Sequence, residues 1–106
     1  MSLELLQNFS PEEAQALVTE GEAVLVDVRE AAEFAAERIA GAVNRPLSAF
    51  DPMALPAKAE RVILHCGVGK RSAMAMEAAR RAGVQVAGHV AGGLMAWKAA
   101  GLPATR

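Results

Sequence analysis

A short apolar segment that runs into a glycine-rich loop and then into a helix constrains the fold of this chain most. Arg61–His65 has the composition of a buried strand and is followed directly by the segment Cys66-Gly67-Val68-Gly69-Lys70-Arg71-Ser72. Residues 73–82 are strong helix formers. A loop between a strand and a helix turns several backbone N–H groups inward at the helix N-terminus, which creates an anion site. The same field lowers the pKa of a thiol, so the sequence predicts a reactive thiolate at Cys66.

The other segments alternate between strand and helix patterns. Ser10-Pro11 begins a helix that ends near Gly21, since serine caps helices, proline suits the first turn and glycine favours a helix end. Ala23–Asp27 is an apolar run closed by an acid, which is typical of a strand buried on both faces. The remaining predicted elements are a strand at Leu3–Asn8, a helix at Glu30–Arg38, a strand at Gly41–Asn44, a helical turn at Asp51-Pro52, a helix at Ser72–Ala82, a strand at Val84–Val90 and a helix at Leu94–Ala100.

This alternation predicts an α/β domain built on a mainly parallel sheet. The 106 residues suffice for one hydrophobic core, so we expect a single domain over residues 1–106. Ligands of such sheets bind beyond the carboxyl ends of the strands. Asp27, Cys66 and the turn at Ala91–Gly93 all follow predicted strands, so we expect them to meet at one edge of the sheet.

Charge and cysteine content narrow the class of partner. A formal net charge of -1 favours neither a nucleic acid nor an anionic membrane. The apolar runs are too short to span a membrane, and the first seven residues lack the pattern of a signal peptide. The single cysteine excludes an internal disulfide and a CxxC redox pair, and it fits a reducing compartment. We therefore expect a cytoplasmic protein.

The loop after Cys66 supplies candidate ligands for an anion. Gly67, Val68 and Gly69 contribute backbone N–H groups. Lys70 and Arg71 stand at its mouth, where at least one of them should bind the anion. Ser72 either caps the following helix or donates a hydrogen bond to the loop. Residues 66–72 together form the predicted site.

Two residues after the second strand are predicted to support this site. Asp27 is interpreted as a buried acceptor for loop N–H groups. Arg29 is expected either beside Asp27 or paired with Glu33, four residues further along a helix.

Neither histidine is predicted to act with Cys66. Adjacent residues of a strand point to opposite faces, so His65 is poorly placed to contact the thiol. His65 and His89 are interpreted as core or rim residues. The sequence has no second cysteine and no spaced histidine pair, so no metal site is predicted.

Two phosphate-binding loops resemble this segment without matching it. The P-loop pattern G-x-x-x-x-G-K-[ST] fails twice, with Leu64 at the first glycine and Arg71 at the hydroxyl position. Cysteine phosphatases place five residues between cysteine and arginine, whereas four separate Cys66 from Arg71. A shorter loop has a smaller opening, which suits one added sulfur better than a phosphate ester.

Three blocks of this chain, in the right order, resemble a single-domain rhodanese, a sulfurtransferase. The blocks are Leu25–Glu30 with Glu33-Phe34 and then Gly41–Asn44 with Pro46-Leu47, the C-x-x-G-x-R-S loop at Cys66, Gly69, Arg71 and Ser72, and the closing G-G-x-x-A-W-x-x-A-G-x-P block at Gly92–Pro103. They cover nearly the whole chain, and their combination is specific to that family.

The resemblance implies a compact three-layer fold, with a five-stranded, mostly parallel sheet and helices on both faces. It also implies a ping-pong reaction in which Cys66 takes a sulfane sulfur from a donor and passes it to a thiol or cyanide. The loop N–H groups would hold the outer persulfide sulfur, and Lys70 and Arg71 would bind an anionic donor such as thiosulfate. No cofactor is implied, and a sulfur-relay protein is a further candidate partner.

Two positions depart from the family pattern. Many members have a basic residue after the cysteine, where this chain has Gly67, and Gly-His-Ile where it has Glu37-Arg38-Ile39. One cation fewer predicts weaker thiosulfate binding. Two alternatives therefore stay open beside the sulfurtransferase: a persulfide carrier with little thiosulfate activity, and a cysteine-dependent phosphatase or arsenate reductase.

Overall fold

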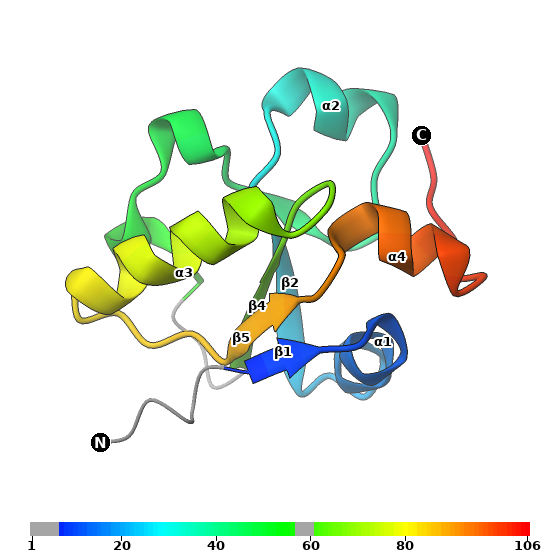
Figure 1. Ribbon diagram of the computed structural model, residues 1–106, viewed down its shortest axis with the longest axis horizontal. Coiled ribbons are helices and arrows are strands. Elements are labelled where there is room, and N and C mark those ends of the chain that lie inside the picture. The colour runs from blue at the N-terminus through cyan, green and yellow to red at the C-terminus, as the bar shows by residue number, and fades with distance from the viewer. Residues whose placement is uncertain (1–6, 57–60) are drawn as a thin grey trace.

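A five-stranded sheet forms the centre of the computed structural model, which describes residues 7–56 and 61–106 (Figure 1). Its strands lie in the order β1-β5-β4-β2-β3, and every pairing between them is parallel. The predicted α/β fold with a mostly parallel sheet is therefore confirmed. The strands are β1 (Gln7–Phe9), β2 (Ala23–Asp27), β3 (Val43–Asn44), β4 (Arg61–His65) and β5 (Gly88–Val90).

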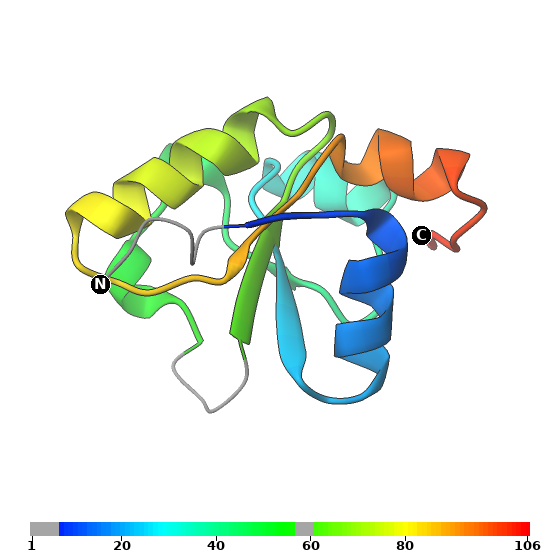
Figure 2. The same cartoon turned by 60° about the horizontal axis from the view of Figure 1, so that its bottom comes forward.

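Helices cover both faces of the sheet, which gives the predicted three layers (Figures 1 and 2). Helices α1 and α4 pack on one face, and α3 packs on the other with two 3₁₀ turns. The helices are α1 (Pro11–Thr19), α2 (Ala31–Ala36), α3 (Lys70–Arg81) and α4 (Gly93–Ala99), and the 3₁₀ turns are η2 (Leu47–Ala49) and η3 (Pro52–Ala54). No helix of residues 7–56 and 61–106 is both long and apolar enough to cross a membrane.

Side-chain alternation along the central strand divides the core into two clusters. Ile63 joins the cluster under α1 and α4, whereas Leu64 joins the cluster under α3. Trp97 anchors α4 in the first cluster, and its indole N–H donates to the carbonyl of Pro103 at 2.8 Å. Alanines at 75 and 79 let α3 approach the sheet closely in the second cluster.

The start of α1 follows the predicted capping pattern. The Ser10 hydroxyl accepts a hydrogen bond from the N–H of Glu13 at 3.1 Å, and the Glu13 carboxylate accepts one from the N–H of Ser10 at 2.9 Å. This cap fixes the direction in which the chain leaves β1.

The last strand is shorter than the alternation of Val84–Val90 predicts, and only Gly88–Val90 pairs. The N–H of Val84 instead bonds the carbonyl of Ala79 at the end of α3, at 2.9 Å. Val86 packs into the α3-side core, so this segment returns from the helix to the sheet before pairing begins. The predicted opening strand appears as β1 at Gln7–Phe9, and residues 3–6 of that prediction lie outside the described residues.

Candidate active site

Cys66 follows β4 directly, and backbone N–H groups converge on its sulfur. The N–H of Gly69 lies 3.1 Å from Sγ, and the N–H of Ser72 lies 3.3 Å from it. The Ser72 hydroxyl lies 3.6 Å from Sγ. The residue is completely buried.

The hydrogen bonds around Sγ lower the thiol pKa below its ordinary value of 9.0. Burial is the largest single influence and raises the pKa, because it disfavours a charged sulfur. The N–H and hydroxyl of Ser72, with the N–H groups of Gly69 and Val68, together outweigh burial. The loop therefore favours a thiolate, as its sequence predicts.

The backbone at Gly69 and the start of α3 explain how these N–H groups reach the sulfur. Gly69 has φ of +105°, which glycine adopts readily, and it is the N-cap of α3. The helix thus begins at Lys70, two residues earlier than predicted. Ser72 lies inside the first turn, so the first of the two alternatives given for it, that it caps the helix, is wrong. Its hydroxyl lies 3.2 Å from the carbonyl oxygen of Gly69 within the loop.

A second glycine loop, at the start of α4, packs against the Cys66 loop and forms hydrogen bonds with it. The N–H of Leu94 donates to the carbonyl of Cys66 at 2.7 Å, and the N–H of Met95 donates to the carbonyl of Gly67 at 3.0 Å. A Cβ on Gly93 would lie 2.4 Å from the Cys66 carbonyl oxygen. Glycine at 93 is therefore required for the two loops to touch.

Arg71 does not point freely into the loop, because it forms an ion pair with Glu33 of α2. Its Nη1 lies 2.7 Å from Glu33 Oε1, and its Nη2 lies 3.1 Å from Oε2. This hydrogen bond is the main reason that the pKa of Glu33 falls from 4.5 to about 2. A depressed carboxyl pKa means that the pair contributes stability above about pH 4.5 and loses it as the pH falls toward 2. At neutral pH, the charge of Arg71 is largely compensated.

The other predicted loop residues lie near the surface. Lys70 and Val68 are exposed. A Cβ on Gly67 would lie 3.3 Å from Nη2 of Arg71. A basic side chain at 67 would therefore meet the guanidinium that Glu33 holds.

Asp27 and Arg29 form a buried pair beneath the site. The Asp27 carboxylate accepts hydrogen bonds from the backbone N–H of Arg29 at 2.9 Å and from its guanidinium at 2.8 Å. The first of the two predicted arrangements of Arg29 is thus present, and the alternative pairing with Glu33 is wrong. The N–H of Val28 donates to the carbonyl of His65 at 2.8 Å, which ties this turn to the end of β4.

The two histidines lie on opposite faces of the sheet. His65 is buried beside Asp27, 3.5 Å from Nε2 to Oδ2, and burial is the main cause of its lowered pKa. His89 instead reaches the site, with Nδ1 2.7 Å from the Ser72 hydroxyl. The interpretation of His89 as a plain core or rim residue missed this contact. No sequence signal marks this contact, because it depends on the parallel pairing that sets His89 beside Leu64, two residues before Cys66.

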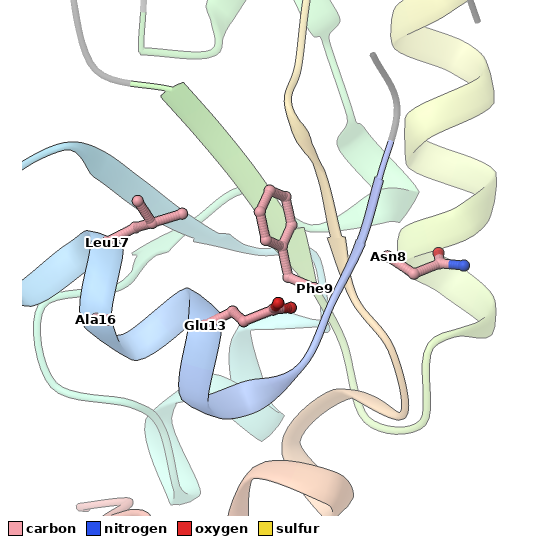
Figure 3. Close-up of a pocket in the computed structure, with 5 residues that line it drawn as sticks. All are labelled: Asn8, Phe9, Glu13, Ala16 and Leu17. Carbon is pink, nitrogen blue, oxygen red and sulfur yellow. The ribbon is translucent and has the colours of Figure 1, made fainter. Parts of the chain in front are cut away.

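A shallow hollow of about 640 Å³ lies elsewhere, against β1 and α1. Its lining residues are Asn8, Phe9, Glu13, Ala16 and Leu17. The side chain of Asn8 points to the other side of β1 from that of Phe9 (Figure 3). No residue of the Cys66 loop lines this hollow. Within residues 7–56 and 61–106, no group of three His, Cys, Asp or Glu residues is arranged to hold a metal ion.

Comparisons with known proteins agree with this geometry. Residues 10–100 match the model of the rhodanese-like domain, and the chain belongs to that family. An uncharacterised protein of Synechocystis sp., slr1261, is 42% identical over 99 residues. That match covers 92% of this chain and 55% of the relative, so the chain spans little more than half of that protein.

Solved structures of other proteins share the fold. A thiosulfate sulfurtransferase of Pseudomonas aeruginosa superposes with a TM-score of 0.82 and 25% identity, over 97% of this chain and 21% of that one. A protein of unknown function from Rhodopseudomonas palustris, described as a possible tyrosine phosphatase, has a TM-score of 0.78 and 24% identity, over 94% of this chain and 85% of that one. The second likeness shows the fold alone.

Proposed function

We propose that this protein is a sulfurtransferase in which Cys66 carries a sulfane sulfur from a small anionic donor, such as thiosulfate, to a thiol or cyanide. The observation that carries the proposal is the pair of N–H groups, from Gly69 and Ser72, that lie 3.1 and 3.3 Å from Sγ. Fixed donors of this kind stabilise an anionic sulfur without any reorganisation during the reaction. The likeness to the Pseudomonas sulfurtransferase supports thiosulfate as a donor.

The chemistry needs no cofactor and no acid at the leaving group. The Cys66 thiolate attacks the outer sulfur of thiosulfate, the S–S bond breaks, and sulfite leaves with the electron pair. The outer sulfur remains on Cys66 as an anionic persulfide. A thiolate or cyanide then attacks that sulfur, and Cys66 leaves again as a thiolate.

A second candidate, a persulfide carrier served by a partner protein, is favoured by the ion pair at the loop mouth. Glu33 compensates the charge of Arg71, the cation expected to attract thiosulfate, and Cys66 is completely buried. Both features weaken capture of a small dianion from solution. A sulfur-relay partner would deliver sulfur by direct contact and would not depend on that charge.

A phosphatase is less well supported than either. Four residues separate Cys66 from Arg71, and Glu33 already pairs with the guanidinium of that arginine. Phosphoryl transfer relies on cations that neutralise the transferred group. Hydrolysis of p-nitrophenyl phosphate that requires Cys66 would revive this candidate.

Donor loading followed by intact-mass measurement tests the proposal. The protein is incubated with thiosulfate or with glutathione persulfide, and each sample is then treated with cyanide. We expect the mass of one sulfur atom to be added and then removed by cyanide, and protein alkylated beforehand with iodoacetamide should stay unmodified. Loading by the persulfide alone favours the carrier, and no loading by either donor contradicts the proposal.

Glu33 and Arg71 should change thiosulfate affinity in opposite directions. Glu33→Gln removes the charge that compensates Arg71, so KM for thiosulfate should fall roughly three- to tenfold with kcat little changed. Arg71→Ala should raise KM, because it removes the cation and leaves Glu33 uncompensated. Steady-state kinetics with cyanide as acceptor measures both values.

Glu77 provides the matched control for this charge change. It pairs with Arg80 and Arg81 on the exposed part of α3, and its pKa is also lowered to about 2. Glu77→Gln therefore changes net charge equally without touching the loop. An equal decrease of KM in both Glu→Gln variants would show that net charge, and not the Arg71 pair, governs donor binding.

A further inference from the structure

A chain of hydrogen bonds leads from Cys66 to two side chains that the sulfur chemistry above does not use. The Cys66 sulfur lies 3.6 Å from the Ser72 hydroxyl, which lies 2.7 Å from Nδ1 of His89. On the other side of the ring, Nε2 lies 2.9 Å from Oδ1 of Asn8. We call these four residues the relay.

Strand register places the relay on one face of the sheet. Asn8 pairs with His89 across β1 and β5, and His89 pairs with Leu64 across β5 and β4. Partners across parallel strands point to the same face, and Leu64 belongs to the core cluster under α3. Figure 3 shows the Asn8 side chain directed toward α3, away from Phe9. Ser72, in the first turn of α3, completes the line.

The chemistry of an amide fixes the direction of each hydrogen bond. An amide oxygen only accepts, so Nε2 of His89 carries the hydrogen that is donated to Asn8. In a neutral ring, Nδ1 is then bare and accepts the hydrogen of the Ser72 hydroxyl. That contact is shorter than the 3.2 Å to the carbonyl of Gly69, the other acceptor nearby. The hydroxyl therefore presents lone pairs, and not its hydrogen, to the sulfur.

We propose that His89 takes up the proton of the Cys66 thiol through Ser72, with Asn8 holding the ring in the tautomer that can do so. The S–H bond breaks and its proton passes to the Ser72 oxygen, while the original hydroxyl proton passes to Nδ1. The products are a thiolate, an unchanged hydroxyl and an imidazolium, with no oxidation or reduction. His89 acts on the sulfur only through Ser72, so it is a positioning residue.

This transfer reverses the two hydrogen bonds of the Ser72 hydroxyl, whereas Nε2–H of His89 continues to donate to Asn8. Nδ1–H now donates to the Ser72 oxygen, and the hydroxyl donates to the sulfur. The thiolate gains a donor beyond the N–H groups of Gly69 and Ser72. Protonation of His89 and deprotonation of Cys66 therefore favour each other, and the two groups titrate as a pair.

The other charged groups near the His89 ring do not account for the coupling between His89 and Cys66. His65, at the end of β4, points to the other face of the sheet, and Cys66, which follows it, belongs to the relay. On α3, Lys70 is exposed and Arg71 is engaged by Glu33. Within the described part of the chain, burial alone accounts for the lowered pKa of His89, so an uncoupled ring stays neutral at pH 7.

The rate at which iodoacetamide alkylates Cys66, followed from pH 5 to pH 10 on the full chain, tests the proposal. Loss of the proton acceptor in His89→Gln should slow alkylation at pH 6 about tenfold, the equivalent of one pKa unit, with similar rates at pH 9. Asn8→Asp keeps the acceptor for Nε2 and adds a negative charge that favours the imidazolium. Its rate at pH 6 should equal or exceed that of the unaltered protein.

Nitrogen-15 NMR of the unaltered protein gives a readout that does not depend on the folding of a variant. His89 should change charge over the same pH range as Cys66. When the His89 ring is neutral, it should carry hydrogen on Nε2 alone. Blocking Cys66 with iodoacetamide should shift the His89 titration, whereas His65, the other histidine of the chain, serves as the internal control. Identical alkylation profiles for His89→Gln and the unaltered protein, or hydrogen on Nδ1 of the neutral ring, would overturn the relay.

The relay rests on the proposed function only for the identity of the reaction that uses the thiolate. Alkylation and NMR involve no sulfur donor, so their outcome is independent of persulfide formation. A protein that shows the coupled titration but acquires no sulfur would refute the sulfurtransferase and leave the relay. A protein that acquires sulfur but whose Cys66 and His89 titrate independently would refute the relay and leave the sulfurtransferase.

Discussion

Cys66→Ser should reduce sulfur transfer from thiosulfate to cyanide by roughly 10⁴-fold or more, which is the scale seen when a nucleophile is removed. A serine hydroxyl is not ionised by the N–H groups that lower the pKa of the thiol. It also forms no stable bond to a sulfane sulfur, so no intermediate can accumulate. Turnover measured as thiocyanate formation should fall to the uncatalysed rate.

The fold should survive the same substitution. Serine fits the space left by the sulfur and can accept hydrogen bonds from the N–H groups of Gly69 and Ser72. We expect the free energy of unfolding to change by about 1 kcal/mol. Thermal melts followed by circular dichroism check this. A folded serine variant that still acquires a cyanide-removable sulfur would show that Cys66 is not the carrier.

Gly93→Ala should destabilise the whole domain and disrupt the site together. The new Cβ would lie 2.4 Å from the carbonyl oxygen of Cys66 and 2.7 Å from that of Gly67. These are backbone atoms, so the two loops must separate and the hydrogen bonds from Leu94 and Met95 must break. Lost hydrogen bonds and a φ of +61° together cost roughly 3 kcal/mol or more. That corresponds to a decrease in Tm of about 12 °C or more.

Gly101→Ala is the control that separates strain from collision. Gly101 also has a positive φ, of +82°, but no described atom lies within 4 Å of the Cβ position. The free energy of unfolding of this variant should fall only by the cost of the backbone conformation, roughly 1 kcal/mol, and the variant should keep full activity. Equal losses of Tm in the two variants would show that the contact between the loops contributes little.

The Cys66 loop could be predicted because its residue types act locally. Two glycines, two cations and a helix-forming segment follow one strand, and backbone geometry alone then directs N–H groups at the sulfur. The parallel sheet was predictable for the same reason, since each strand and helix is marked by its own composition. The shortened β5 was not, because the hydrogen bond of Val84 to α3 competes with pairing and leaves no mark in the alternation.

The partners of the loop could not be predicted, because they come from distant parts of the chain. Glu33 is 38 residues from Arg71, and Asn8 is 81 residues from His89. Each pair depends on which strands become neighbours and in which register. A charged residue on a helix is usually solvated, so Glu33 alone gave no reason to expect that it would hold Arg71.

The contact between the glycine loops has a consequence for the strength of the donors around the sulfur. Met95 donates to the carbonyl of Gly67, and that carbonyl belongs to the same peptide group as the N–H of Val68. Accepting a hydrogen bond polarises a peptide group, which makes its own N–H a stronger donor. The hydrogen bond from Met95 therefore makes the Val68 N–H, which lowers the pKa of Cys66, a stronger donor and the sulfur less basic. In this way α4 affects the reactivity of the sulfur through the backbone alone.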